Sequence, residues 1–195
     1  MDFKIQSCLL TDVLFCSSLI PKNSYIVELY GLMDELSSAF NFMLFYAQQS
    51  DIIEKEVCDL LQENIYFLSK TIIPETSRIY FTPLYQHEKL EAVKWNFLID
   101  KYRIILENVD NKKFVSQWNN ELALWVNEAR VRTRKIERFM VSPTPNKTED
   151  ILYNDIFVDK DTLIWLNKSE VWLNLITFFN ELSDVLFKVG VLFNG

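Results

Sequence analysis

The sequence predicts an all-α protein, an up-and-down bundle of five helices in a single domain over residues 1–195. Apolar residues recur at steps of three and four along most of the chain, which is the period of an amphipathic helix. Clusters of turn residues separate the long periodic stretches, and only 3 of the 195 residues are glycine. With 49% hydrophobic and 24% charged residues, a chain of this length buries enough apolar surface for one core.

The first predicted helix follows an N-cap signal at residues 23–24 and continues to the polar residues 48–50. Its apolar side chains share one face: Ile26, Leu29, Tyr30, Met33, Leu36, Phe40, Met43, Leu44 and Ala47. A second helix is expected from Asp51 and ends before Pro74, because proline lacks an N–H donor and its ring crowds the preceding turn. The stretch 72–86 is therefore expected to be a loop.

The third and fourth helices follow this loop. The third is expected over residues 88–107, and the turn residues 108–111 end it. The fourth has an apolar stripe over residues 122–140 and is stopped by the two prolines of residues 142–146. The fourth helix is the most regular of the five, so its other faces can be assigned from the sequence.

A long connection, residues 142–168, leads to the last helix, which is expected to begin at about Ser169 and to carry an apolar stripe to Val189. At the other end of the chain, residues 1–22 form an N-terminal segment that is partly apolar and does not resemble a secretory signal, since it carries Asp12 and lacks a strong basic flank. No uncharged apolar run reaches the ~20 residues that a membrane span needs. A cytoplasmic protein without membrane partners is therefore expected.

Charge and composition exclude several classes of function. The formal net charge is 20 − 27 = −7, which disfavours a nucleic-acid partner because phosphate binding needs a positive face. The 3 cysteines form no CxxC pair, as is typical of a reducing compartment. A single histidine, His87, rules out His-rich zinc sites, and no metal ligands are assigned. Three scattered glycines cannot form a glycine-rich phosphate loop.

Some polar residues on the helices are not explained by the core pattern. The fourth helix carries a second stripe of ordered polar character: Ala123, Asn127, Arg130, Arg134 and Glu137. Asp34 flanks the apolar stripe of the first helix, and Asn180 and Asp184 lie one turn apart on the last helix. These residues fit either a solvated face with weak ion pairs or arginines that meet Asp34 across an interface or bind an anionic ligand.

Four strings in these helices resemble the PduO-type ATP:corrinoid adenosyltransferases. They occur in the order of that family and cover most of the chain: IPKNSYIVELYGLMDELSS at 20–38, LQENIYFLSKTIIP at 61–74, NEARVRTRKIERF at 127–139 and FFNELSDVLFKVG at 178–190. The resemblance implies a homotrimer of five-helix bundles with active sites between subunits. It also implies ATP, Mg²⁺ and cobalamin, which is a corrinoid, as the small molecules bound.

The resemblance also implies roles for individual residues. Asp34 matches an aspartate that pairs with an arginine of the neighbouring subunit, and Arg130 matches that arginine. On the ATP side, where cations stabilise the departing triphosphate, the family pattern places Arg134 and Glu137. Three further residues match binding positions of the family: Asn180 toward ATP, Lys22 after the N-terminal loop, and Phe114 at the lower face of the corrinoid.

This chain also departs from the family pattern. The Thr/Gly/Asp-rich loop that wraps the triphosphate in the family aligns with residues 6–13, QSCLLTDV, which contain no glycine. A Pro-Gly-Gly after the family phenylalanine is replaced by residues 117–119, Gln-Trp-Asn. Asn127, Lys135 and Glu181 stand at positions of a common histidine and two arginines of the family.

Three hypotheses remain open at the level of sequence. The first is an ATP:cob(I)alamin adenosyltransferase, which transfers the 5′-deoxyadenosyl group of ATP to Co(I). The second is a degenerate, non-catalytic homologue that acts as a corrinoid-binding or protein-interaction module. The third is a structural bundle in which the pair of Asp34 and Arg130 only holds subunits together. The retained helix residues favour the enzyme, and the altered residues 6–13 favour a non-catalytic homologue.

Overall fold

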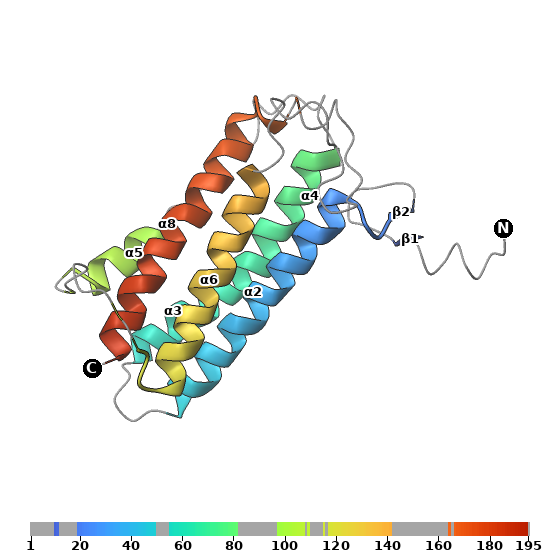
Figure 1. Ribbon diagram of the computed structural model, residues 1–195. Coiled ribbons are helices and arrows are strands. Elements are labelled where there is room, and N and C mark those ends of the chain that lie inside the picture. Colours follow the sequence, from blue (N-terminus) through green and yellow to red (C-terminus); the bar gives the residue numbers. More distant parts are fainter. Residues whose placement is uncertain are drawn as a thin grey trace.

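The computed structural model describes most of the helical part of the chain, namely residues 10–11, 19–49, 55–81, 97–107, 109, 115, 117–141, 164 and 166–194. Three long helices form the centre of the bundle: α2 (Tyr25–Gln48), α6 (Glu121–Val141) and α8 (Glu170–Phe193). In Figure 1 these helices run side by side, and α6 packs against both α2 and α8. The all-α bundle predicted from the sequence is confirmed.

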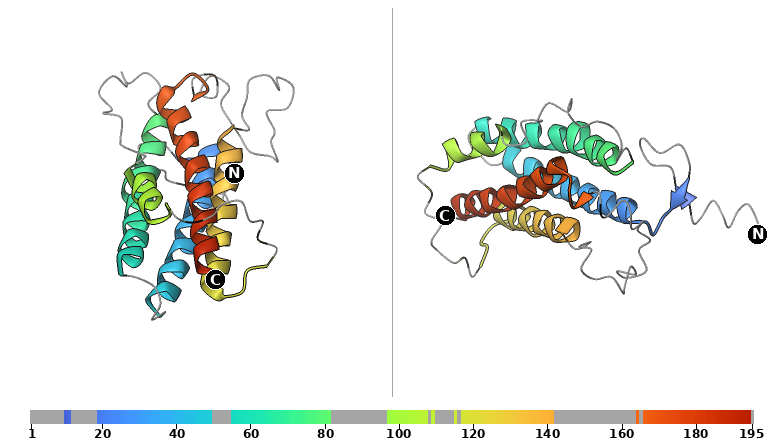
Figure 2. Two further views of the ribbon diagram at one scale, coloured as in Figure 1. Left: turned by 90° about the vertical axis from the view of Figure 1, so that its left-hand side faces the viewer. Right: turned by 90° about the horizontal axis from the view of Figure 1, so that it is seen from above.

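A fourth rod is built from α3 (Lys55–Phe67), the π-helical turn η1 (Leu68–Ile72) and α4 (Ile73–Phe81). The two further views in Figure 2 show this rod and the short helix α5 (Phe97–Ile105) on the opposite side of the molecule from α6. Both α3 and α4 contact α2, and α5 lies against α3 and α8. The rod therefore closes the face of α2 and α8 that α6 leaves uncovered.

The described part of the N-terminal segment contributes two short strands. β1 (Leu10–Thr11) pairs antiparallel with β2 (Ile20–Pro21), so that Leu10 lies opposite Pro21 and Thr11 opposite Ile20. The strands precede the N-terminus of α2, beyond the end of the bundle (Figure 1). Residues 1–9 and 12–18 lie outside the described residues, so most of residues 6–13 does as well.

The core is formed by the stripes that the periodicity predicts. On α2, the fully buried side chains include Ile26, Leu29, Met33, Leu36 and Met43. Aromatic rings dominate the end of the core where α2 begins. The Tyr25 ring stacks on Phe139 of α6 at a centroid distance of 4.7 Å, and its hydroxyl donates to the Phe139 carbonyl at 3.3 Å. The same ring lies 6.1 Å from Tyr80 of α4 and 6.5 Å from Trp172 of α8, which connects four helices through one stack.

The helix boundaries agree with the expectations except around Pro74. The stretch 72–86 was expected to be a loop, but residues 72–81 are helical and Pro74 lies in α4. The π turn accounts for the difference, because the N–H of Ile73 bonds to the carbonyl of Leu68, five residues earlier. This wider turn just before the proline leaves room for its ring, which would crowd the preceding turn of a regular α-helix.

The remaining boundaries can be compared only in part. The third predicted helix, 88–107, corresponds to α5 with a turn at residues 106–107, and its first residues lie outside the described part of the chain. The same holds for residues 51–54 of the second helix and for nearly all of the connection 142–168. The fourth helix begins and ends within two residues of the predicted stripe, whereas the last helix begins one residue after Ser169 and continues to Phe193, beyond the predicted stripe that ends at Val189. Ser169 caps α8, since its Oγ accepts the N–H of Trp172 at 3.3 Å.

Candidate functional site

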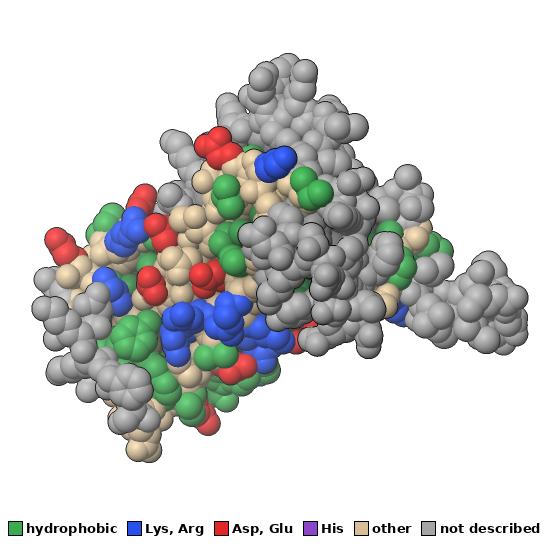
Figure 3. Space-filling view, turned by 45° about the horizontal axis from the view of Figure 1, so that its top comes forward, with side chains coloured by type: hydrophobic (Ala, Val, Ile, Leu, Met, Phe, Trp, Pro, Cys, Tyr) green, Lys and Arg blue, Asp and Glu red, His purple; other side chains and the backbone are tan. Residues whose placement is uncertain are grey.

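The candidate site lies where α6 and α8 pack along each other. The buried stripe of α6 includes Val126, Ala129, Thr133 and Ile136, all fully buried. The second, polar stripe predicted from the sequence runs beside it. Figure 3 shows Lys and Arg side chains gathered on this side of the molecule, with hydrophobic and acidic side chains around them. Basic side chains therefore collect on a helix pair of a protein that is acidic overall.

Arg130 is the centre of the site and is half-buried. Its Nε–H and one of its Nη2–H groups donate to Oδ1 of Asn127 at 3.1 and 3.0 Å. Its guanidinium carbon lies 5.8 Å from the centroid of the Phe187 ring on α8. A guanidinium has five N–H donors, so these contacts occupy two of them. Within the described residues the other three have no hydrogen-bond acceptor and are available to a ligand or a second chain.

Two positively charged side chains, Arg130 and Arg134, lie close enough to affect each other at this point of the bundle. Burial lowers the pKa of Arg130, and the neighbouring Arg134 lowers it further, while Asp184 of α8 opposes both effects. Arg134 is exposed and makes no ion pair within the described residues. Two guanidinium groups that repel each other, with one carboxylate in partial compensation, form a place where a polyanion is stabilised.

The last helix presents a row of side chains to the same site. Asn180, Asp184 and Phe187 lie at steps of four and three residues, hence on one face of α8, and Phe187 places that face against Arg130. Asn180 is exposed, and its carbonyl accepts the hydroxyl of the buried Ser183 at 2.8 Å. The sequence had identified Asn180 and Asp184, whereas Phe187 was assigned no role. The spacing of seven residues from Asn180 is the signal that could have identified it.

Glu181 was noted as an acidic residue where the family has an arginine. In the structure its Oε1 lies 3.3 Å from Nη2 of Arg103, which belongs to α5. Arg103 also bonds to Asp100 of its own helix at 3.0 Å. The charge of Glu181 is thus compensated by an arginine from another helix, and α5 is held to α8 beside Asn180. The sequence could not reveal this pair because 78 positions separate its members.

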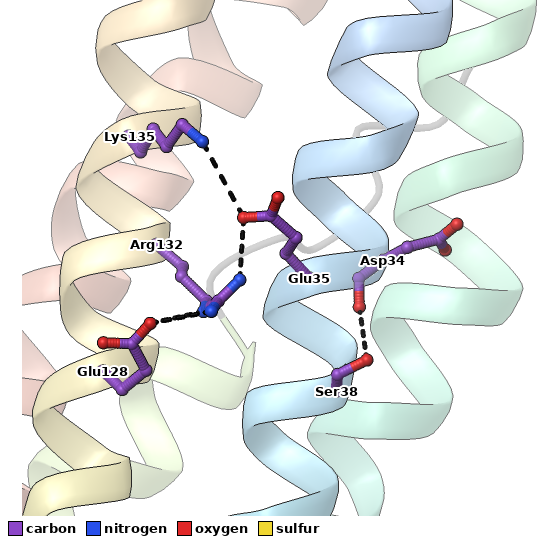
Figure 4. Close-up of polar contacts among 6 residues, drawn as sticks. All are labelled: Asp34, Glu35, Ser38, Glu128, Arg132 and Lys135. Atoms are coloured by element: carbon purple, nitrogen blue, oxygen red, sulfur yellow. Dashed lines mark hydrogen bonds and ion pairs between the residues drawn. The ribbon is translucent and has the colours of Figure 1, made fainter.

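Asp34 and Arg130 lie on different surfaces of one chain. Figure 4 shows that the Asp34 carboxylate points away from α6, and its only drawn contact is its carbonyl, which accepts the Ser38 hydroxyl at 3.0 Å. Arg130 instead faces α8, through Phe187. Asp34 is exposed and has no ion pair among the described residues. A contact between Asp34 and Arg130 therefore requires two copies of the chain.

The neighbouring Glu35 makes the contacts between α2 and α6 that the sequence reasoning missed. Its Oε2 lies 2.7 Å from Nη1 of Arg132 and 3.8 Å from Nζ of Lys135 (Figure 4). Arg132 also pairs with Glu128 one turn earlier on α6, at 2.8 Å. The negative charge of Glu35 and the positive charges on α6 could have suggested this network. Arg132 and Lys135 find an acidic partner within the chain, so their positions are explained without a ligand.

The three other predicted site residues are Lys22, Glu137 and Phe114, and the structure says less about their part in the site. Lys22 is exposed in the turn between β2 and α2, and Glu137 is half-buried on α6, two turns after Arg130. Phe114 lies outside the described residues. The structure therefore brings together Arg130, Arg134 and the α8 row, and it does not test the positions of Lys22 and Phe114 relative to them.

Metal and membrane features were searched in the same part of the chain. Among the described residues, no group of three or more His, Cys, Asp and Glu side chains is placed to hold a metal ion. None of the described helices combines the length and the apolar character needed to cross a bilayer.

The sequence was compared with protein-family models and with curated proteins. The sequence model of the cobalamin adenosyltransferase family matches residues 11–192. No curated protein matches the chain. The matched range includes every described helix except the last residue of α8, and it contains the whole of the α6–α8 site.

Proposed function

Because the chain belongs to the cobalamin adenosyltransferase family, we propose that it is an ATP:cob(I)alamin adenosyltransferase whose nucleotide site includes the facing surfaces of α6 and α8. The observation that carries this proposal is the half-buried Arg130, whose charge is opposed by Arg134 and favoured by Asp184 of α8, with Asn180 one turn before Asp184 on the same helix. A cation pair of this kind suits the triphosphate of ATP, which is the most highly charged part of either substrate.

The reaction sets the task of these residues. The cobalt of the reduced corrinoid donates its electron pair to the 5′ carbon of ATP, the C5′–O bond breaks, and its electrons leave with the triphosphate. Negative charge therefore increases on the triphosphate in the transition state. Arg134, exposed and close to Arg130, stabilises that charge, and Asn180 contacts the nucleotide from α8.

Mg²⁺ is expected to reach the site with ATP. Magnesium is usually held by substrate phosphates, waters and one or two carboxylates. By the family resemblance, Glu137 on α6 and Lys22 before α2 are assigned to the nucleotide, and Phe114 is assigned to the corrinoid.

The site is proposed to be completed by a second copy of the chain in a homotrimer. Arg130 has three N–H donors without an acceptor within the described residues, and Asp34 is an exposed carboxylate on another face. Two different surfaces that complement each other form a head-to-tail contact, which gives a ring when the rotation between subunits closes. A trimer joined by Asp34 and Arg130 places each Arg130 at a boundary between subunits.

A non-catalytic homologue is the second candidate. It is favoured by residues 6–13, where the bulky Leu9 and Leu10 replace the small residues that let backbone N–H groups approach a phosphate. Such a protein would bind a corrinoid or a protein partner without transferring the adenosyl group. A bundle with a purely structural pair of Asp34 and Arg130 would bind neither substrate.

Calorimetry with Mg-ATP followed by a corrinoid adenosylation assay distinguishes these candidates. The enzyme binds Mg-ATP and converts reduced corrinoid, and Arg134→Ala lowers turnover by about ten- to a thousand-fold, the range for the loss of a charge-stabilising group. Arg132→Ala is the matched control, because it removes the same charge from α6 on the side that faces Glu35. No turnover in the unmodified protein, or equal turnover in the Arg134 variant and its control, contradicts the proposal.

A further inference from the structure

The segment before α6 is fastened to the C-terminal end of α8 by side-chain amides. The backbone N–H of Asn119 donates to Oδ1 of Asn194 at 2.7 Å, and Nδ2 of Asn194 donates to the carbonyl of Gln117 at 3.2 Å. Nδ2 of Asn120 donates to the carbonyl of Phe193 at 2.6 Å. These three bonds fix residues 117–120 on α8, although more than 70 positions separate the two segments.

Trp118, inside this segment, fits against Gly190 of α8. A Cβ atom built on Gly190 would lie 2.7 Å from Cζ3 and 2.9 Å from Cη2 of the Trp118 ring. These distances are shorter than van der Waals contact, so the ring occupies the space that a side chain at position 190 would need. An alanine at this point of α8 would displace the indole, because the ring approaches the helix backbone closely.

The same indole supports the ring that lies under Arg130. Trp118 meets Phe187 edge-to-face, with ring centroids 6.4 Å apart and planes at 84°. Phe187 also lies against the Arg130 guanidinium, whose carbon is 5.8 Å from the ring centroid. Arg130 is thus held from two sides, by the amide of Asn127 and by an aromatic ring that Trp118 supports.

From these contacts we propose that Trp118 is a positioning residue that acts through Phe187 to hold the guanidinium of Arg130 in the α6–α8 site. The functional consequence rests on the proposed function. An arginine with three donors to offer binds a triphosphate or a carboxylate best when its plane is fixed before the partner arrives. Loss of the Trp118 contact lets Phe187 turn, and Arg130 then loses one of its two supports.

Nuclear magnetic resonance of the Arg130 Nε–H group tests the contact without requiring catalysis. The signal is assigned by its absence from Arg130→Lys, and it reports both the Asn127 hydrogen bond and the nearby ring. Trp118→Ala and Gly190→Ala are expected to move this signal, because the first removes the indole and the second displaces it. Trp125→Ala is the matched control, since Trp125 also belongs to this part of the chain but stacks on Phe42 of α2 at 4.2 Å.

The outcomes separate this inference from the proposed function. A moved signal in both variants, with no change in the control, supports the positioning role even if the protein binds no ATP. An unmoved Arg130 signal in folded Gly190→Ala overturns the positioning role. If Trp118→Ala does not fold, Gly190→Ala alone is sufficient for the test. If the protein binds Mg-ATP, both variants are expected to weaken binding by about two- to five-fold, the value of one cation–π contact. Unchanged affinity with a moved signal overturns the link from Trp118 to the nucleotide.

Discussion

Tyr102 makes this protein less stable at alkaline pH. Its side chain is 2% exposed at the contact of α5 with α3, where Nδ2 of Asn64 donates to the phenolic oxygen. Burial raises the pKa of Tyr102 far above its usual range, the Asn64 hydrogen bond lowers it in part, and Glu63 raises it again. The folded protein therefore keeps this phenol neutral at pH values where the unfolded chain loses the proton.

The size of the effect follows from the two pKa values. In the unfolded chain the phenol has a pKa of about 10, so between pH 8 and pH 11 the unfolded state releases a proton that the folded state retains. The unfolded state then binds fewer protons, and the free energy of unfolding falls as pH rises. For one such group the loss at pH 11 is about 1.4 kcal/mol relative to pH 8, from RT ln(1 + 10). The contribution of the neutral Tyr102 phenol to stability is therefore complete well below pH 10, and it decreases as the pH rises above that value.

Chemical unfolding at pH 8 and pH 11 measures this loss in the unmodified protein, in Tyr102→Phe and in Tyr66→Phe. Tyr102→Phe is destabilised at pH 8 by about 1–3 kcal/mol because Asn64 loses an acceptor, but it should lose about 1.4 kcal/mol less than the unmodified protein on going to pH 11. Tyr66 is 67% exposed on α3, so its removal should leave the loss unchanged. Tyr25, whose pKa burial also raises, is present in all three proteins and cancels. An equal loss in Tyr102→Phe and the unmodified protein would refute the reasoning.

Three further substitutions have expected effects on stability that unfolding experiments can check. Gly31→Ala should stabilise α2 by about 0.8–1 kcal/mol, because Gly31 is exposed in mid-helix and a Cβ there meets nothing within 4 Å; a loss of stability would contradict this. Arg132→Ala should cost about 1 kcal/mol or less, since its bonds to Glu35 and Glu128 are partly exposed, and the cost should shrink at high salt. Ser169→Ala should cost about 1 kcal/mol by removing the cap of α8, whereas Ser169→Asp should not.

The long helices were predictable because local signals agree with the tertiary structure. In α6, the apolar stripe from Leu122 to Met140 is also the buried stripe, and prolines follow directly after the helix. Pro74 was misread because the sequence rule describes a regular α-helix. No residue of Leu68–Ile72 distinguishes a π turn from a regular α-helix, so the sequence could not predict a wider turn just before the proline.

Individual site residues were predictable, whereas their partners were not. The polar stripe on α6 identified Arg130 and Arg134 from periodicity, and the family resemblance gave them roles. The ring of Phe187 and the indole of Trp118 belong to the site only through packing between distant segments. A regular apolar pattern on α8 could not distinguish Phe187 from an ordinary core residue, because its function depends on what lies beside it.

The π turn also indicates where the fold accepts a deletion. A π turn contains one residue more than an α-helical turn, so removing one residue from Leu68–Ile72 would leave a regular α-helix there. α4 would keep its orientation relative to α3, and Thr76, Ser77 and Ile79 would stay buried. Pro74 would then follow a regular α-helical turn, which its ring would crowd. In an alignment of relatives, a one-residue gap at this turn would therefore be expected together with another residue in place of the proline.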